Sequence, residues 1–388
     1  MAVPSHLTAL FFLLLVSVLG PVLALRLKLP TAIVLILVGI AAGPGGLGLL
    51  EDTPHVALLS ELGFLILMFL AGMEIDFESL RTAGLRLISL PTLTVVGFGI
   101  LAVVIGIQRH LSLLDVLVVS ASSVGMPLAV LQETGHTQKP LGRYVMLTAS
   151  IGEFVSILAV TGFELFAEEA TVSHRIVKVI KVLLLFAVSA VLIRWARAVV
   201  WWRPDPFRRL IRHHDVAELG VRTGLLVMIA FVIISATLGV EAILGAFIAG
   251  ALVAFVLREK SVLESKLSAL GHGLFIPIFF TVVGVRFDPR LVDLATIGNA
   301  GVFVLIVVSI KVLPSLVFAP RILGLRERLA AGALLSAPLT LVVAIATIGR
   351  RLGAIDAARE ATFVLLAIVL SIVFPILFRF LAPSRQNA

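Results

Sequence analysis

One carboxylate lies in the middle of an otherwise apolar stretch of the chain. The stretch is residues 143–166, RYVMLTASIGEFVSILAVTGFELF, and the carboxylate is Glu153. About 20 mostly apolar residues suffice to cross a membrane. An ionised side chain at bilayer depth costs at least about 2.5–3.5 kcal/mol, so such residues usually mark ion or proton sites. We therefore predict that Glu153 binds and releases a cation or a proton.

A second charge lies at membrane depth in another segment. Lys311 is several residues from either end of the apolar run 302–320. Two interpretations stand side by side: Lys311 supports Glu153 at a proton-coupled site, or the two residues form a static structural ion pair.

Hydroxyl groups near Glu153 in the sequence are candidate ligands for a hard cation. Each hydroxyl could equally well bond the backbone of its own helix. These residues are Ser122, Ser123, Thr148, Ser150 and Ser156.

Two apolar segments carry a serine shortly before a proline: SASSVGMP at 120–127 and LLSAPLT at 334–340. Proline removes a backbone hydrogen bond, which a membrane helix tolerates where the freed groups face protein or water. Paired interruptions at matching positions in two halves are the sequence sign of a secondary transporter's binding site. We predict crossed broken helices at Gly125, Pro127, Ser336 and Pro338; the alternative is that each proline merely kinks a packed helix.

The composition indicates a polytopic membrane protein. Of the 388 residues, 60% are hydrophobic and 14% are charged, against about 45–50% and 25% in soluble proteins. Without cysteine the chain has no disulfide and no thiolate metal site. It contains neither a GxxxxGK[ST] phosphate loop nor an HExxH motif. We expect no enzyme activity and no cofactor beyond a transported ion and H⁺.

About 13 segments meet the length criterion for a spanning helix. The run 7–25 is assigned to the first of them and not to a signal peptide, because no basic region precedes it. The second to sixth and the ninth to thirteenth segments form two inverted five-helix repeats, with the broken helix fourth in both. The segments lie near 6–25, 30–50, 58–75, 87–107, 112–131, 142–165, 176–199, 216–238, 241–257, 270–285, 297–319, 328–349 and 360–381.

The basic residues predict the orientation. With the N-terminus outside and the C-terminus in the cytoplasm, 20 of the 31 Lys and Arg fall on the inner side and 9 on the outer side. The net charge of +8 then reflects cytoplasmic loops, and we expect no nucleic-acid partner. The longest basic loop, 194–215, is predicted to contact anionic lipid of the inner (plasma) membrane.

Several further motifs run in order through nearly the whole chain. They are LPTAIVLILVGIAAGPGGLG (29–48), ELGFLILMFLAGMEID (61–76), SSVG (122–125), LGRYVMLTASIGEF (141–154), LGAFIAGALV (244–253), PIFFTVVGVRFD (277–288) and Lys311. Together they resemble the monovalent cation:proton antiporter superfamily, in the branch of bacterial sodium/proton antiporters and Kef-type potassium efflux systems.

The resemblance implies a thirteen-helix fold of two parts. Helices 1–3 (1–86) and 8–10 (216–290) would form a dimerisation domain, and helices 4–6 (87–167) and 11–13 (291–388) a core transport domain. Helix 7 and the basic loop (168–215) would link the halves. Family members are thought to form homodimers and to move the core past the dimer domain, exposing the site to each side alternately.

The chain departs from the family at the site itself. Members usually carry Asp-Asp, Asn-Asp or Gln-Asp where this sequence has Gly152-Glu153. Glu153 matches the essential ion- and proton-binding Asp, and Gly152 cannot pair with Lys311. Lys311 would then pair with Glu153 itself or stay unpaired until a cation leaves.

With one carboxylate, we expect electroneutral exchange of Na⁺ or K⁺ for H⁺ at Glu153. The alternatives are a ligand-regulated Kef-like potassium efflux unit lacking its soluble domain, and a symporter of organic anions on a related fold.

Overall fold

The computed structural model describes residues 5–27, 29–75, 84–167, 172–202, 218–256, 261–319 and 322–382. Every regular element in this part of the chain is helical. Ten helices here are long and apolar enough to cross a membrane, and three shorter apolar helices accompany them. The prediction of an all-α polytopic membrane protein is thereby confirmed.

The chain forms two compact units, and each unit contains two separate stretches of sequence. Unit 1 consists of residues 1–77 and 164–287, and unit 2 of residues 78–163 and 288–388. Glu153, Lys311 and both predicted helix interruptions belong to unit 2. The roles of the two parts in transport and dimerisation stay predictions.

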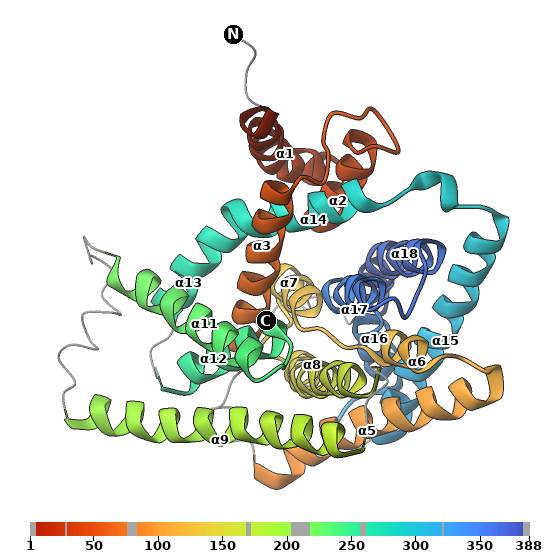
Figure 1. Ribbon diagram of the computed structural model, residues 1–388. Helices are drawn as coiled ribbons and strands as arrows, with labels where there is room; N and C mark the ends of the chain where they lie inside the picture. Colours follow the sequence, from red (N-terminus) through yellow and green to blue (C-terminus); the bar gives the residue numbers. More distant parts are fainter. Residues whose placement is uncertain are drawn as a thin grey trace. The chain divides into compact units, whose positions relative to one another are not determined.

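Unit 1 is built around α3, which packs against α12 and α14, while α2 packs against α14. A π-helical turn, η1, continues α13 into α14. The elements, red to orange and green to cyan in Figure 1, are α1 (Ser5–Leu27), α2 (Thr31–Ala42), α3 (Pro54–Met73), α9 (Val172–Trp202), α11 (Leu219–Thr237), α12 (Ala242–Val256), α13 (Ser261–Leu270), η1 (Gly271–Phe275) and α14 (Ile276–Arg286).

Glycines bring helix backbones of unit 1 into direct contact. Gly39 of α2 and Gly284 of α14 form one such pair, and Gly72 of α3 and Gly250 of α12 form another. A Cβ atom added to any of the four would collide with a backbone carbonyl oxygen of the opposite helix. Small residues of this kind drive membrane-helix packing, because lipid supplies little hydrophobic force between helices.

Unit 2 is centred on α15, which packs against α5, α16 and α18, while α17 packs against α18 and α6. The α16–α17 segment is the most enclosed of the ten candidate spans. The elements are α5 (Gly84–Arg109), α6 (Leu113–Ser120), α7 (Gly125–Thr134), α8 (Pro140–Ala167), the 3₁₀ turn η2 (Pro289–Leu291), α15 (Leu294–Phe318), α16 (Leu325–Leu335), α17 (Leu339–Arg351) and α18 (Ala357–Leu381).

Several boundaries differ from the sequence prediction. The segment predicted near 270–285 begins earlier, with α13 at Ser261. Helix α2 ends at Ala42, whereas the predicted segment ran to 50; the glycines and proline of GPGGLG form a turn instead. Helix α9 continues to Trp202, so the first part of the predicted loop 194–215 is helical. Residues 203–217 lie outside the described residues, and the predicted lipid contact there stays a prediction.

Candidate functional site

The first interruption separates α6 from α7 at residues 121–124. Helix α6 begins with a capping box in which Ser112 and Asp115 satisfy each other's backbone N–H groups, and it ends at Ser120. Gly125 and Pro127, predicted as part of the break, lie just after it in the first turn of α7. Proline fits there because the first N–H groups of a helix have no partner within the helix.

The second interruption separates α16 from α17 at residues 336–338. Ser336 is the C-cap of α16 and Pro338 is the N-cap of α17, where the structure also places the predicted break. The hydroxyls of Ser123 in the first interruption and Thr340 in the first turn of α17 are 2.7 Å apart. The first interruption is therefore in hydrogen-bond contact with the start of the helix that follows the second.

Glu153 belongs to α8, and its carboxylate lies at the N-terminal end of α7. The side chain is 2% exposed. Oε2 accepts a hydrogen bond from the backbone N–H of Val124, the N-cap of α7, at 3.0 Å. Oε1 accepts a longer one from the Ser123 hydroxyl at 3.4 Å. The carboxylate thus satisfies a donor at the positive end of a helix dipole.

Lys311 lies at the opposite end of the same interruption. Its Nζ donates to the carbonyl oxygen of Ser120, the last residue of α6, at 2.8 Å and to the hydroxyl of Ser122 at 2.7 Å. Nζ also lies 4.2 Å from the centre of the Phe98 ring. The side chain is fully buried. The ammonium therefore caps the negative end of α6.

The two buried charges do not form a salt bridge in the described part of the chain. Glu153 uses the N-terminal end of α7, and Lys311 uses the C-terminal end of α6. These contacts do not support the interpretation of the two residues as a static structural ion pair. Among the described residues, no cationic side chain partners the carboxylate of Glu153.

Of the predicted hydroxyl ligands, only Ser122 and Ser123 reach the two charges. The hydroxyl of Thr148 donates to the carbonyl of Tyr144, and that of Ser156 to the carbonyl of Gly152, both within α8. These two follow the alternative of bonding their own helix. Ser150 is half-buried and makes no hydrogen bond with Glu153.

Helix α8 is fastened to α5 near its cytoplasmic end in the predicted orientation. The phenol of Tyr144, the only tyrosine of the chain, and the hydroxyl of Thr94 are 2.7 Å apart. Both side chains are buried. This contact fixes the turns of α8 that lead to Glu153.

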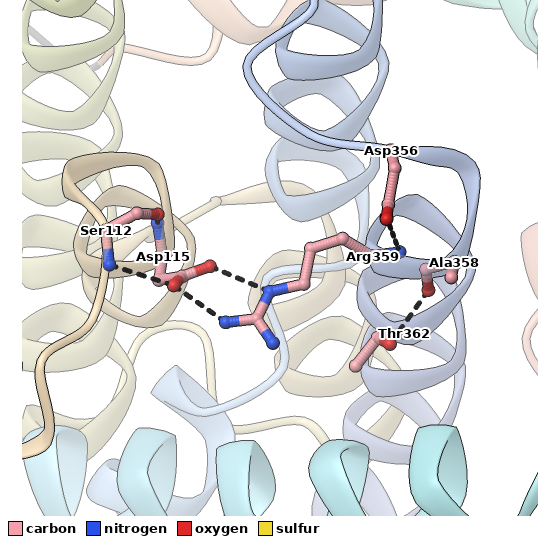
Figure 2. Close-up of polar contacts among 6 residues, drawn as sticks. All are labelled: Ser112, Asp115, Asp356, Ala358, Arg359 and Thr362. Carbon is pink, nitrogen blue, oxygen red and sulfur yellow. Dashed lines mark hydrogen bonds and ion pairs between the residues drawn. The ribbon is translucent and has the colours of Figure 1, made fainter.

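A second buried carboxylate of unit 2 escaped the sequence analysis. Asp115 in α6 accepts two hydrogen bonds from Arg359 in α18, from Nε at 3.1 Å and from Nη2 at 2.7 Å (Figure 2). The guanidinium also lies 4.8 Å from the ring centre of Phe303 and 5.5 Å from that of Phe363. The one available signal was the Ser-x-x-Asp capping pattern at 112–115. The pair holds the start of α6 against α18.

Among the described residues, no three side chains of His, Cys, Asp or Glu cluster as metal ligands. The site instead offers a single carboxylate with hydroxyl and backbone groups around it. Oxygen ligands with one negative charge suit a hard monovalent cation or a proton better than a transition metal.

Comparison with known proteins identifies relatives of this chain. The chain is 30% identical to the putative Na⁺/H⁺ antiporter YjbQ of Bacillus subtilis, over 99% of this chain and 64% of that protein. It is 28% identical to the Na⁺/H⁺-K⁺ antiporter GerN of Bacillus cereus, over 78% of this chain and 76% of GerN. The chain thus spans about two thirds to three quarters of the length of these relatives.

The fold also matches a solved structure. The sodium proton antiporter MjNhaP1 of Methanocaldococcus jannaschii superposes with a TM-score of 0.67 over 97% of both chains, at 14% identity. The profile of the family described as sodium/hydrogen exchanger, transmembrane, matches residues 12–382. The chain therefore belongs to the transmembrane sodium/hydrogen exchanger family, which confirms the predicted membership of the monovalent cation:proton antiporter superfamily.

Proposed function

We propose that the chain exchanges Na⁺ or K⁺ for protons and that Glu153 binds the cation and the proton in turn. One observation carries this proposal: the buried carboxylate receives hydrogen bonds only from Val124 and Ser123 and has no cationic partner among the described residues. A buried charge without a partner is costly, so the site favours a bound proton or cation as the counter-charge.

Family membership supports the proposal at the level of function class. It indicates a transporter and not an enzyme. YjbQ and GerN are named as antiporters, and the name of GerN includes both Na⁺ and K⁺. Because the chain spans 64% of YjbQ, the exchange activity of this chain is part of the proposal.

The charge balance favours electroneutral exchange of one cation for one proton. Glu153 is neutral when protonated and forms a neutral pair when it binds a monovalent cation. The ammonium of Lys311 contacts Ser120 and Ser122, and in this scheme it stays there, with its charge unchanged, in both states. The charge carried across the membrane is then the same in both directions of the cycle.

We further propose an elevator-like alternating-access movement. Unit 2 contains Glu153 and both interruptions, which suits the core that carries the ion. Unit 1 would then form the homodimer. The protein would lie in the inner membrane with its N-terminus outside and its C-terminus in the cytoplasm, as the distribution of basic residues predicts.

The test is exchange by the purified protein in proteoliposomes that carry a pH gradient. We expect added cation to dissipate the gradient with the native chain and not with Glu153→Gln. The matched control is Glu133→Gln, at an exposed carboxylate on α7, which should retain exchange. Exchange by Glu153→Gln would refute the central assignment. An initial rate that depends on an imposed membrane voltage would refute electroneutrality.

Potassium efflux of the Kef type is the second candidate function. It is favoured by the similarity to GerN, whose name includes K⁺. Comparing Na⁺, K⁺ and Li⁺ in the same assay across pH separates the candidates. Proton-coupled movement of Na⁺ supports the antiporter, whereas K⁺ efflux that leaves the pH gradient intact supports the efflux unit.

A further inference from the structure

Gly152 and Ser122 are in unusually close contact for residues on two different helical segments. A Cβ atom built on Gly152 would lie 2.7 Å from Cβ of Ser122 and 2.8 Å from its hydroxyl oxygen. Real Cβ atoms essentially never approach that closely, and Cβ of Ser122 cannot move without its backbone. Any side chain at position 152 would therefore displace Ser122 from its present place.

The turn of α8 that begins at Gly152 also holds the backbone of Ser122. The N–H of Ser122 donates to the Ser156 hydroxyl at 3.3 Å. That hydroxyl in turn donates to the carbonyl of Gly152 at 2.7 Å. Ser122 and Ser156 are both buried. The residues of this turn thus hold the backbone of Ser122 in place. Because Gly152 has no side chain, the side chain of Ser122 has room beside it.

Held in this position, Ser122 accepts a hydrogen bond from Lys311. The ammonium of Lys311 has three N–H donors, and Ser122 supplies one of the two oxygens that it contacts. The other is the Ser120 carbonyl, and the ring of Phe98 lies alongside. Because Lys311 is fully buried, no water replaces a lost oxygen partner at low cost.

We propose that Gly152 and Ser122 form a matched pair that holds the Lys311 ammonium at the first helix interruption and away from Glu153. Ser122 is the positioning residue, and Gly152 is the residue that gives it room. The space that a side chain at 152 would fill is the space in which the Ser122 hydroxyl now lies. A side chain at 152 and the Ser122 side chain therefore cannot both occupy this space. By the proposal, a serine at 152 takes over the contact with Lys311 when position 122 is glycine.

A double-mutant cycle in the full-length protein tests this pair. The single variants are Gly152→Ser, which creates the collision, and Ser122→Gly, which removes the hydroxyl. We expect each to lower the apparent melting temperature of the detergent-purified protein by several degrees. The combined Ser122→Gly/Gly152→Ser variant moves the hydroxyl from one segment to the other, so it should recover most of the loss.

A second combined variant separates packing from the hydroxyl. Ser122→Gly/Gly152→Ala relieves the collision but supplies no oxygen for Lys311. It should stay less stable than Ser122→Gly/Gly152→Ser. Ser122→Ala, which removes one oxygen without adding any atom, should also melt below the native protein. Additive effects of the two single substitutions, or equal stability of both combined variants, would overturn the proposal.

Transport kinetics supply the readout that a purely structural role would not change; this arm rests on the proposed function. In Ser122→Ala the Lys311 ammonium loses a partner that holds it away from Glu153 and can then compete with the cation. We expect the half-saturating cation concentration to rise by up to about tenfold, the size of one hydrogen bond to a charged group, with a smaller effect on the maximal rate. The combined Ser122→Gly/Gly152→Ser variant should restore the native half-saturating cation concentration. Failure to restore it contradicts the positioning role of Ser122. If the native protein shows no exchange, the proposed function fails, while the melting temperatures still decide the matched pair.

Discussion

The hydroxyl oxygens of Ser123 and Thr340 lie 2.7 Å apart and join the first helix interruption of unit 2 to the first turn of α17, which follows the second. Ser123 also donates its single proton toward Glu153. Because one hydroxyl has one proton, Thr340 donates to Ser123 whenever Glu153 is ionised and accepts the Ser123 proton. A residue of the helix that follows the second interruption thereby sets the hydrogen bonding of the carboxylate at the first.

The substitution Thr340→Val tests this link, since it removes the hydroxyl and keeps the branched shape. Ser123 would lose its donor, and the maximal exchange rate should fall by up to about tenfold, the size expected for one hydrogen bond. Thr340→Ser should keep most of the rate. The control is Thr362→Val, because the hydroxyl of Thr362 bonds only the carbonyl of Ala358 in its own helix. Equal rates for Thr340→Val and the native protein would show that the link is dispensable.

Removal of the ammonium at Lys311 should destabilise the first interruption. In Lys311→Met the carbonyl of Ser120 and the hydroxyl of Ser122 lose their donor, while the aliphatic volume is largely kept. We expect a lower apparent melting temperature. Any exchange that remains should still be independent of membrane voltage, because Glu153 alone carries the exchanged ion. Lys139→Met, at an exposed position, is the control, and an unchanged melting temperature in Lys311→Met would contradict the capping role.

The ion pair between Asp115 and Arg359 should contribute far more than a surface pair. Arg359→Gln leaves the carboxylate of Asp115, 5% exposed, without its charged partner, and breaking a buried pair in this way costs about 3–5 kcal/mol. The double variant Asp115→Asn/Arg359→Gln should recover part of the loss. The reference is the exposed pair of Glu133 and Arg379, for which Arg379→Gln should cost about 0–1 kcal/mol. Unfolding in denaturant measures both, and similar costs for the two pairs would contradict this ranking.

Asp293 should make the start of α15 sensitive to acid. The backbone N–H of Thr296 donates to this N-cap carboxylate at 2.7 Å, which lowers the pKa of Asp293 below its ordinary value. A lowered pKa in the folded state adds stability above the ordinary aspartate pKa, about 3.9. That stability is lost as the pH falls through the lower pKa of the folded state.

The variant Asp293→Asn isolates this titration, because asparagine also caps helices and does not ionise. Apparent melting temperatures measured from neutral pH down to about pH 3 should fall less steeply for Asp293→Asn than for the native protein. Asp293→Ala should be less stable than both at neutral pH. Parallel curves for the native protein and Asp293→Asn would show that the carboxylate does not contribute to the acid sensitivity.

The sequence predicts the fold class and the location of the candidate site for clear physical reasons. Glu153 and Lys311 stand out because a charge inside an apolar run is costly. The second interruption is found at Ser336 and Pro338, where proline removes a helix hydrogen bond. For the first interruption, the break precedes Gly125, since Pro127 fits the first turn of α7.

The partners of these residues could not be predicted in the same way. Lys311 contacts Ser120 and Ser122, about 190 residues earlier in the chain, and neither serine differs in type from the many that bond their own helix. Arg359 resembles an ordinary residue of an outer loop until α18 brings it to Asp115. Hydropathy and spacing describe each helix alone, whereas these contacts depend on how separate helices pack.

The glycine contacts of unit 1 have a consequence for how this chain tolerates change. At Gly39, Gly72, Gly250 and Gly284 the addition of a single methyl group would push two helices apart. Large apolar residues on exposed faces of the same unit, such as Leu226, can exchange with one another at little cost. In this half of the protein, the smallest residues are therefore the least replaceable.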